Sequence, residues 1–455
     1  MSRRDKYPYQ LRSLRVPGGV GTAARHDVHK KRRDALVPFF SKRNVLYLEP
    51  LIAEKVRELC ELISKHAMEE TPINLSDSFF AFCNEYDFEN CILTYIITQD
   101  SVTTNFLFAD QADLLADERK AAIFRHHSNE LVMGINTNKH FPWIPDFLES
   151  LPLSISKPIM PPGLVDLLDL FDVSYPFMNR NAAILIYTQR VRAELLAIME
   201  AKSSGLASDK LLGPTGKESV YDSVLDNPSL PAEEKALLRL EQEGALLVLA
   251  GTESPAKSLN IIFCHLLSNP SVLNELRAEL TTAAKSTLWT DLEQLPYLSA
   301  IIEEGNRLSF GVTARTARIA YEPLTYTPSS YATYPTTSAK SYTIPPGTPV
   351  SVTTLSAHTA ESVFPDPFKF DPERWLGHEG RERRKFQMAF GKGGRKCLGI
   401  ELARAELYLV TAALVRAFDM TLWQTDESDV AFVHDYQVAM PKLDSKGVRV
   451  MATAL

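Results

Sequence analysis

A cysteine that is surrounded by glycines and followed by a long helical run constrains this chain more than any other feature. The segment FGKGGRKCLG occupies residues 390–399, and the strongly helical run IELARAELYLVTAALVRAF follows it. Glycine allows a tight turn in which the backbone approaches a bound group closely. The free amides and positive end of the helix would stabilise a thiolate at Cys397, and Arg395 and Lys396 add positive charge. The segment predicts a protected, metal-binding thiolate; the alternative is a buried structural cysteine beside a glycine-rich turn.

The rest of the chain predicts a mainly α protein with small β-sheets. Helix-period stretches occur over residues 45–130 and 164–203, and one long helix is expected from Pro231 to His265. Short alternating runs with Pro and Gly turns predict short strands over 311–356 and 420–455.

Charge and cysteine usage exclude several classes of protein. The formal net charge of -7 argues against a nucleic-acid-binding function. The five cysteines are widely spaced and form no CxxC pair, which argues against zinc or disulfide frameworks and favours a reducing compartment. No apolar stretch of about 18 residues is present, so the sequence encodes no transmembrane helix.

The motif AGTESP lies in the middle of the long helix expected after Pro231. Pro255 has no N–H, so the carbonyl of Gly251 loses its helical partner and the helix should kink or open there. An unpaired carbonyl beside the Glu253 carboxyl and the Ser254 hydroxyl suits a water molecule that relays protons. The alternative is a kinked core helix whose glutamate faces solvent.

The cysteine segment resembles the haem-binding signature of the cytochromes P450. That signature, F-x-x-G-x-R-x-C-x-G, is matched at Phe390, Gly393, Arg395, Cys397 and Gly399. The resemblance covers roughly residues 25–450 and looks most like fungal secondary-metabolism members of the trichodiene-oxygenase type. It implies a cytochrome P450 fold, a helical domain that encloses haem b, with Cys397 as the axial ligand to iron. It also implies cofactor contacts in this segment at Phe390, Gly391, Arg395, Cys397 and Gly399.

A second motif, E-x-x-R, is formed by Glu304 and Arg307. Spacing i, i+3 places both side chains on one helix face, where such a pair alone could be an ordinary surface salt bridge. In the family, an arginine in a segment like FDPERW completes a buried Glu–Arg–Arg cluster, which implies that role for Arg374. The resemblance assigns all three residues a structural role, and truncating one of them should strand a buried charge.

The resemblance also implies contacts to the haem on its other sides. His29 and Arg33, in HKKRR, resemble the family's W-x-x-x-R pair that binds the haem propionates, with His in place of Trp; the alternative is an exposed basic run or membrane-surface patch. Arg315, in TARTAR, is the preferred strand arginine over Arg318. In the long helix, the resemblance places Ala250 and Gly251 beside the haem and gives Glu253 and Ser254 the delivery of protons.

The activity implied by the resemblance is that of a haem-thiolate monooxygenase. Such an enzyme inserts one atom of O2 into a hydrophobic small molecule, here of terpenoid or polyketide type. Electrons would come from a separate NADPH-cytochrome P450 reductase, since the chain has no G-x-G-x-x-G fingerprint. Two alternatives stay open: a haem-thiolate enzyme that rearranges or dehydrates its substrate without activating O2, and a non-catalytic haem-binding remnant.

The start of the chain is short for this family. Only 28 residues precede His29, whereas microsomal relatives carry a membrane anchor, helices and strands before that point. We expect an N-terminally truncated form, with a remnant segment at 1–28 and a single cytochrome P450 domain over 29–455. The resemblance implies association with the endoplasmic reticulum membrane.

Overall fold

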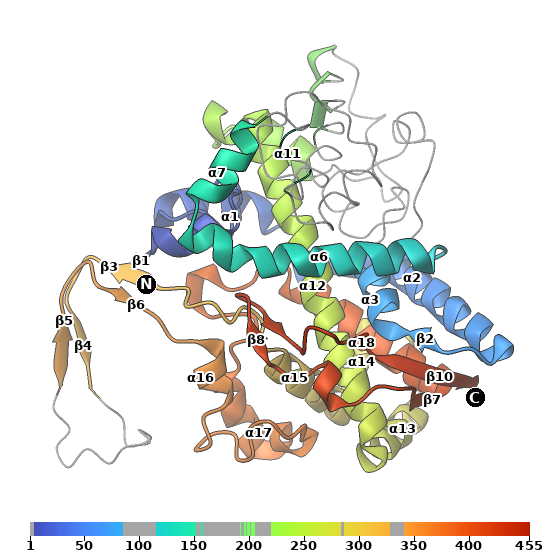
Figure 1. Ribbon diagram of the computed structural model, residues 1–455. Coiled ribbons are helices and arrows are strands. Elements are labelled where there is room, and N and C mark those ends of the chain that lie inside the picture. The colour runs from blue at the N-terminus through green and yellow to red at the C-terminus, as the bar shows by residue number, and fades with distance from the viewer. Residues whose placement is uncertain are drawn as a thin grey trace.

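The computed structural model describes residues 4–84, 115–151, 220–283, 286–327 and 341–455, together with scattered positions between 155 and 204. The described chain is mainly helical with small sheets, as predicted (Figure 1). Most of the helix expected over 164–203 lies outside the described residues. The α-helices are α1 (His26–Leu36), α2 (Lys42–Glu69), α3 (Leu75–Asn84), α6 (Glu118–His140), α7 (Trp143–Ser150), α11 (Val220–Asp226), α12 (Leu237–Ser268), α13 (Pro270–Thr282), α14 (Trp289–Leu292), α15 (Pro296–Ser309), α16 (Thr354–His358), α17 (Gly377–Arg383) and α18 (Ile400–Ala417).

Short 3-10 helices connect several of these elements. They are η1 (Pro8–Ser13), η4 (Ala232–Lys235), η5 (Pro372–Trp375), η6 (Arg384–Phe386), η7 (Gly393–Arg395) and η8 (Glu427–Asp429). Among the described helices, none is long and apolar enough to span a membrane.

Helix α12 runs through the middle of the molecule and packs against α3, α15 and α18 (Figure 1). Its 32 residues continue through Pro255, so the helix does not open at this residue. The Pro255 ring is buried, and packing holds a residue that would break an isolated helix. Gly305 of α15 allows a close approach to α12, because a Cβ at this position would collide with the side chain of Ile262. This approach fixes the neighbouring Glu304 inside the core.

The strands form four small antiparallel sheets. Their bounds are β1 (Arg4–Lys6), β2 (Ile73–Asn74), β3 (Arg318–Ala320), β4 (Leu324–Tyr326), β5 (Tyr342–Ile344), β6 (Pro349–Val350), β7 (Phe418–Leu422), β8 (His434–Asp435), β9 (Ala439–Met440) and β10 (Arg449–Ala454). The strand orders are β1-β3-β6, β2-β10-β7, β4-β5 and β8-β9. Figure 1 shows the β4–β5 hairpin projecting from the body of the molecule.

Residues 4–28 pack onto the rest of the described chain. Strand β1 pairs with β3, with Lys6 opposite Arg318. Further along, the Gly18 N–H donates to Gln242 Oε1 at 2.7 Å, and the Val20 N–H donates to Glu243 Oε1 at 2.9 Å. Both acceptors belong to α12, so the initial segment is tied to the central helix.

Candidate active site

The turn that presents Cys397 is built from glycines and backbone hydrogen bonds. Gly391 and Gly393 have φ angles of 64° and 77°, in the left-handed region that favours glycine. The Cys397 N–H donates to the Phe390 carbonyl at 2.8 Å, which closes the turn. Gly399 is the N-cap of α18, so the cysteine lies just before the helix, as predicted.

The chain by itself favours the thiol form of Cys397. The side chain is accessible to solvent, yet protein atoms surround the sulfur closely enough for burial to raise its pKa. The Gly399 amide and the Arg33 guanidinium lower the pKa, but burial outweighs them. The helix amide therefore acts on the thiolate in the predicted direction, but it does not overcome the effect of burial. Arg395 contributes little there, because its guanidinium donates to the carbonyls of Ala23 and Ala24 at 2.7 and 2.8 Å.

Four basic side chains gather beside this turn: Lys6, His29, Arg318 and Arg395. Burial and the charges of Arg318 and Arg395 lower the pKa of Lys6 to about 7. Burial and the charge of Arg318 lower the pKa of Arg395 to about 10, opposed by Asp5. The Arg395 Nε is buried without a hydrogen-bond partner. These basic side chains repel one another, and one of their buried N–H donors is unpaired. An anionic group such as a carboxylate would stabilise them by pairing with their charges and accepting a hydrogen bond.

The two residues of α1 that were predicted to bind propionates behave differently. His29 is buried, and burial together with Arg395 lowers its pKa to about 3, so the ring is neutral near pH 7 and offers an N–H donor rather than a charge. Arg33 stays cationic and its Nη1 donates to the Lys396 carbonyl at 2.8 Å, next to the cysteine. Arg315 is exposed, whereas Arg318 lies in the basic group.

Helix α12 presents one accessible stripe in an otherwise buried stretch. Ala250 and Ser254 are exposed, one turn apart, and Gly251 is half-buried. Glu253 accepts a hydrogen bond from Ser128 Oγ of α6, and burial raises the pKa of its carboxyl. The two predicted proton-delivery residues therefore lie side by side in the sequence but point to different surroundings.

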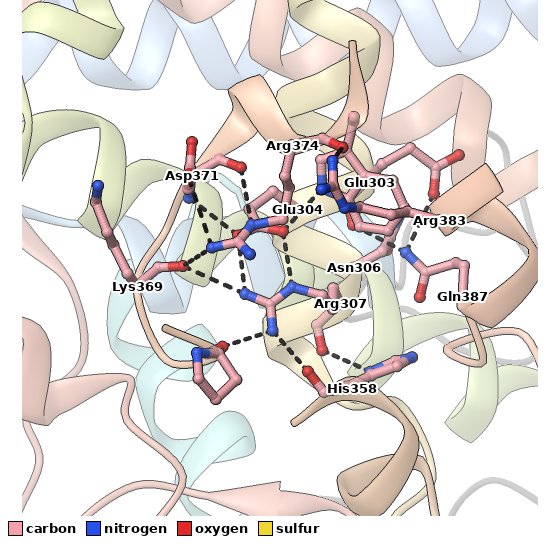
Figure 2. Close-up of polar contacts among 12 residues, drawn as sticks. Glu303, Glu304, Asn306, Arg307, His358, Lys369, Asp371, Arg374, Arg383 and Gln387 are labelled. Atoms are coloured by element: carbon pink, nitrogen blue, oxygen red, sulfur yellow. Dashed lines mark hydrogen bonds and ion pairs between the residues drawn. The ribbon is translucent and has the colours of Figure 1, made fainter. Parts of the chain in front are cut away.

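Glu304, Arg307 and Arg374 form a buried ion cluster (Figure 2). Arg307 Nε and Nη2 donate to the two oxygens of Glu304, each at 2.8 Å. Arg374 Nε lies 3.1 Å from Glu304 Oε1. The Trp375 indole N–H and the Asp371 backbone N–H complete the shell of the carboxylate, at 2.8 and 2.9 Å.

The remaining donors of the two arginines bind backbone carbonyls. Arg307 donates to the carbonyls of His358 and Pro367, at 2.9 and 2.5 Å, and Arg374 donates to the Pro365 carbonyl at 2.9 Å. The cluster therefore ties α15 to the irregular segment that leads towards the cysteine. The Met388 N–H binds His358 Nε2 at 2.8 Å and extends this connection.

Comparisons with known proteins agree with this geometry. The family model described as cytochrome P450 matches residues 159–444. The chain belongs to the cytochrome P450 family. The cytochrome P450 monooxygenase TRI4 of Trichoderma arundinaceum is 31% identical over 97% of this chain and 76% of its own length. The conidiogenone synthase PchP450 of Penicillium rubens is 31% identical over 98% of this chain and 80% of its own.

A solved cytochrome P450 structure, CYP102L1, has the same fold, with a TM-score of 0.66 over 100% of this chain and 85% of that one, at 19% identity. The chain is thus a cytochrome P450 monooxygenase of the fungal secondary-metabolism type, as the sequence predicted. Membership implies a haem cofactor, O2, a redox partner and a small-molecule substrate. The residues present fit a haem: a cysteine presented on a glycine turn, with a basic group beside it for the acidic side groups.

Several side chains near the site were not predicted from the sequence. Lys6 joins the basic group, Ser128 binds Glu253, and Lys257 and Asp435 form part of the charge environment of α12. Lys257 could have been noticed, since it follows Glu253 at i+4 on the same helix face. Ser128 and Asp435 come from distant segments, and only the tertiary structure brings them together.

Proposed function

We propose that this cytochrome P450 inserts one oxygen atom from O2 into a hydrophobic small molecule of terpenoid or polyketide type. The observation that carries the proposal is the presentation of Cys397 on its turn beside a basic group. The names of the relatives support the substrate class, since they are monooxygenases and a conidiogenone synthase. The alternatives, rearrangement or dehydration without O2 and non-catalytic haem binding, are not favoured by these relatives.

We propose haem b as the cofactor, whose iron would be held by the Cys397 sulfur. The bound haem would supply the oxidation chemistry, and the thiolate would push electron density towards iron. Arg33, Arg315 and Arg395 would bind the propionates as cations, and His29 would donate a neutral N–H. The other contacts would come from the turn and the accessible stripe of α12, at Phe390, Gly391, Gly399, Ala250 and Gly251.

Glu253 and Ser254 are proposed to move protons. Burial raises the pKa of the Glu253 carboxyl towards the range in which a side chain can both take up and release a proton. The exposed hydroxyl of Ser254 can donate and accept at the accessible stripe. Glu304, Arg307 and Arg374 are proposed to act structurally.

A redox partner and a cellular location are also proposed. We propose that an NADPH-cytochrome P450 reductase supplies the electrons and that the enzyme works at the endoplasmic reticulum membrane. We also propose that residues 29–455 form one domain, onto which the segment 1–28 packs.

The test is the carbon-monoxide difference spectrum of the reduced, purified chain, followed by turnover with a reductase. We expect a strongly red-shifted Soret band that is lost in Cys397→Ala. The matched control is Cys60→Ala, because Cys60 lies half-buried on α2, away from the turn. A band typical of a neutral ligand in the unaltered chain, or its retention in Cys397→Ala, would refute the proposed ligand.

A further inference from the structure

Lys257 is a buried lysine without a hydrogen-bond partner. Its Nζ is enclosed by protein, and no described group accepts a hydrogen bond from it. It lies on α12, one helical turn after Glu253 and two turns after Ala250. Spacings of i+4 and i+7 put the three residues on one face of the helix. An ammonium group that is removed from water and left unpaired is costly, so such a residue calls for an explanation.

The groups around Lys257 come from four elements. Glu253 precedes it on α12 and is bound by Ser128 of α6. Asp435 of β8 is the second acidic group that acts on it, and both carboxylates raise the pKa of the amine, Glu253 more than Asp435. From α6, Arg125 acts on Glu253 and is itself paired with Asp77 of α3.

The Asp435 carboxylate is hydrogen-bonded to groups other than Lys257. Its Oδ1 accepts from the Thr313 hydroxyl at 2.6 Å and from the Gln437 N–H at 2.9 Å. The Glu253 carboxylate likewise accepts a hydrogen bond from the Ser128 hydroxyl. Neither carboxylate bonds directly to the amine, so Lys257 acts on both through its charge. Arg125 and Lys257 both favour the ionised form of Glu253, and Arg125 has the larger effect. Arg125 is paired with Asp77, whereas Lys257 lies on α12 itself and has no hydrogen-bond partner among the described residues.

We propose that Lys257 is a positioning residue for proton delivery, whose positive charge opposes the effect of burial on Glu253 so that this carboxyl can both release a proton and accept one from the solvent side. The proposal rests on the proposed monooxygenase function. A positive charge that acts on a buried acid favours its charged form, while burial acts in the opposite direction. The amine itself is finely balanced, since burial lowers its pKa to about 7. The charge on Lys257, and with it the ionisation of Glu253, should therefore change close to neutral pH.

The experiment follows the carboxyl group of Glu253 directly. Infrared difference spectra, assigned with Glu253→Gln, would give its titration in the unaltered chain and in Lys257→Met. We expect Lys257→Met to raise the midpoint by about one pH unit or more, Lys257→Arg to restore it, and the exposed Lys446→Met to leave it unchanged. The acid limb of the pH profile of turnover should shift in the same direction, because Glu253 must be ionised to accept a proton. An unchanged Glu253 midpoint in Lys257→Met would overturn the proposal.

A second measurement guards against a variant that fails to fold. In the unaltered chain labelled with 13C-lysine, the ε-carbon resonance that disappears in Lys257→Arg should titrate near neutral pH. Titration at the value of an exposed lysine would also overturn the proposal. Carbon-monoxide spectra of the same samples distinguish failure of the proposed function from failure of the proposed role of Lys257. If the thiolate band is absent, the proposed function fails. If the band is normal but the titrations of Glu253 and Lys257 are unshifted, only the role of Lys257 is refuted.

Discussion

The substitution Glu304→Gln tests the buried ion cluster most directly. Glu304, Arg307 and the indole of Trp375 are fully or almost fully buried. The carboxylate of Glu304 is the acceptor shared by both guanidinium groups, the indole and one backbone amide. Glutamine keeps the size of the side chain but removes the charge and turns one acceptor into a donor that faces a guanidinium.

The expected loss of stability follows from this geometry. Arg307 would remain buried without a counter-charge, and Arg374 would keep only the Asp371 carboxylate, 3.7 Å from its Nη2. Breaking a buried pair in this way costs about 3–5 kcal/mol. The neighbouring Glu303→Gln is the matched control, because Glu303 is only half-buried and its carboxylate receives one hydrogen bond, from Gln387 at 3.1 Å. That change should cost less than about 1 kcal/mol.

Urea unfolding and hydrogen exchange together would measure the difference. A chain of this size with a cofactor need not unfold in one step, so exchange of the amides over 354–376 reports on the segment that the cluster holds. We expect that segment to lose protection in Glu304→Gln well before the rest of the molecule. Equal stability of the Glu304→Gln and Glu303→Gln chains would refute the idea that the cluster holds this segment.

Two further predictions concern residues near the same segment. His358 is fully buried, its Nε2 accepts a hydrogen bond from the Met388 N–H, and burial lowers its pKa to about 4. Because the unfolded state binds more protons below pH 6.5, the free energy of unfolding should fall by about 3 kcal/mol as the pH drops from 6.5 to 4. The variant His358→Gln should lose this pH dependence. Gly311→Ala should destabilise the chain by more than about 1 kcal/mol in thermal unfolding, because φ is +55° and a Cβ would lie 2.5 Å from the Ala389 carbonyl oxygen. Gly347→Ala, at φ +81° with open space around it, should cost clearly less, and an equal effect would show that backbone strain alone matters.

Interactions between residues close together in the chain could be predicted from the sequence, whereas those between distant residues could not be predicted from local patterns. The pairing of Glu304 with Arg307 follows from helical spacing, and the position of Cys397 before a helix follows from local composition. Arg374 lies 70 residues after Glu304, so its membership in the cluster needed the resemblance to a family. The partners Ser128 and Asp435 carry no local signal at all.

Burial explains what the sequence motifs could not show about Cys397 and His29. Sequence motifs show which charges lie near Cys397 and His29 but not how much water is removed from them. For both side chains burial is the largest influence, and it favours the neutral form. The positive charge expected from Arg395 is also directed elsewhere, towards two backbone carbonyls. A cysteine that is a thiol in the free chain must lose a proton when it binds a metal, so metal binding at Cys397 depends on pH.

The ion cluster around Glu304 and the basic group around Arg395 differ in whether their charges are balanced within the chain. Around Glu304, this carboxylate and that of Asp371, 3.7 Å from Arg374, balance the charges of the two arginines, whose other donors bind backbone carbonyls. Around Arg395, basic side chains lower one another's pKa values, and Asp5 opposes this effect only in part. An anionic group bound there would restore those pKa values and so stabilise the folded state in proportion to its affinity. At the proposed site, haem binding and folding would therefore be linked through the charges near Arg395 as well as through a bond at Cys397.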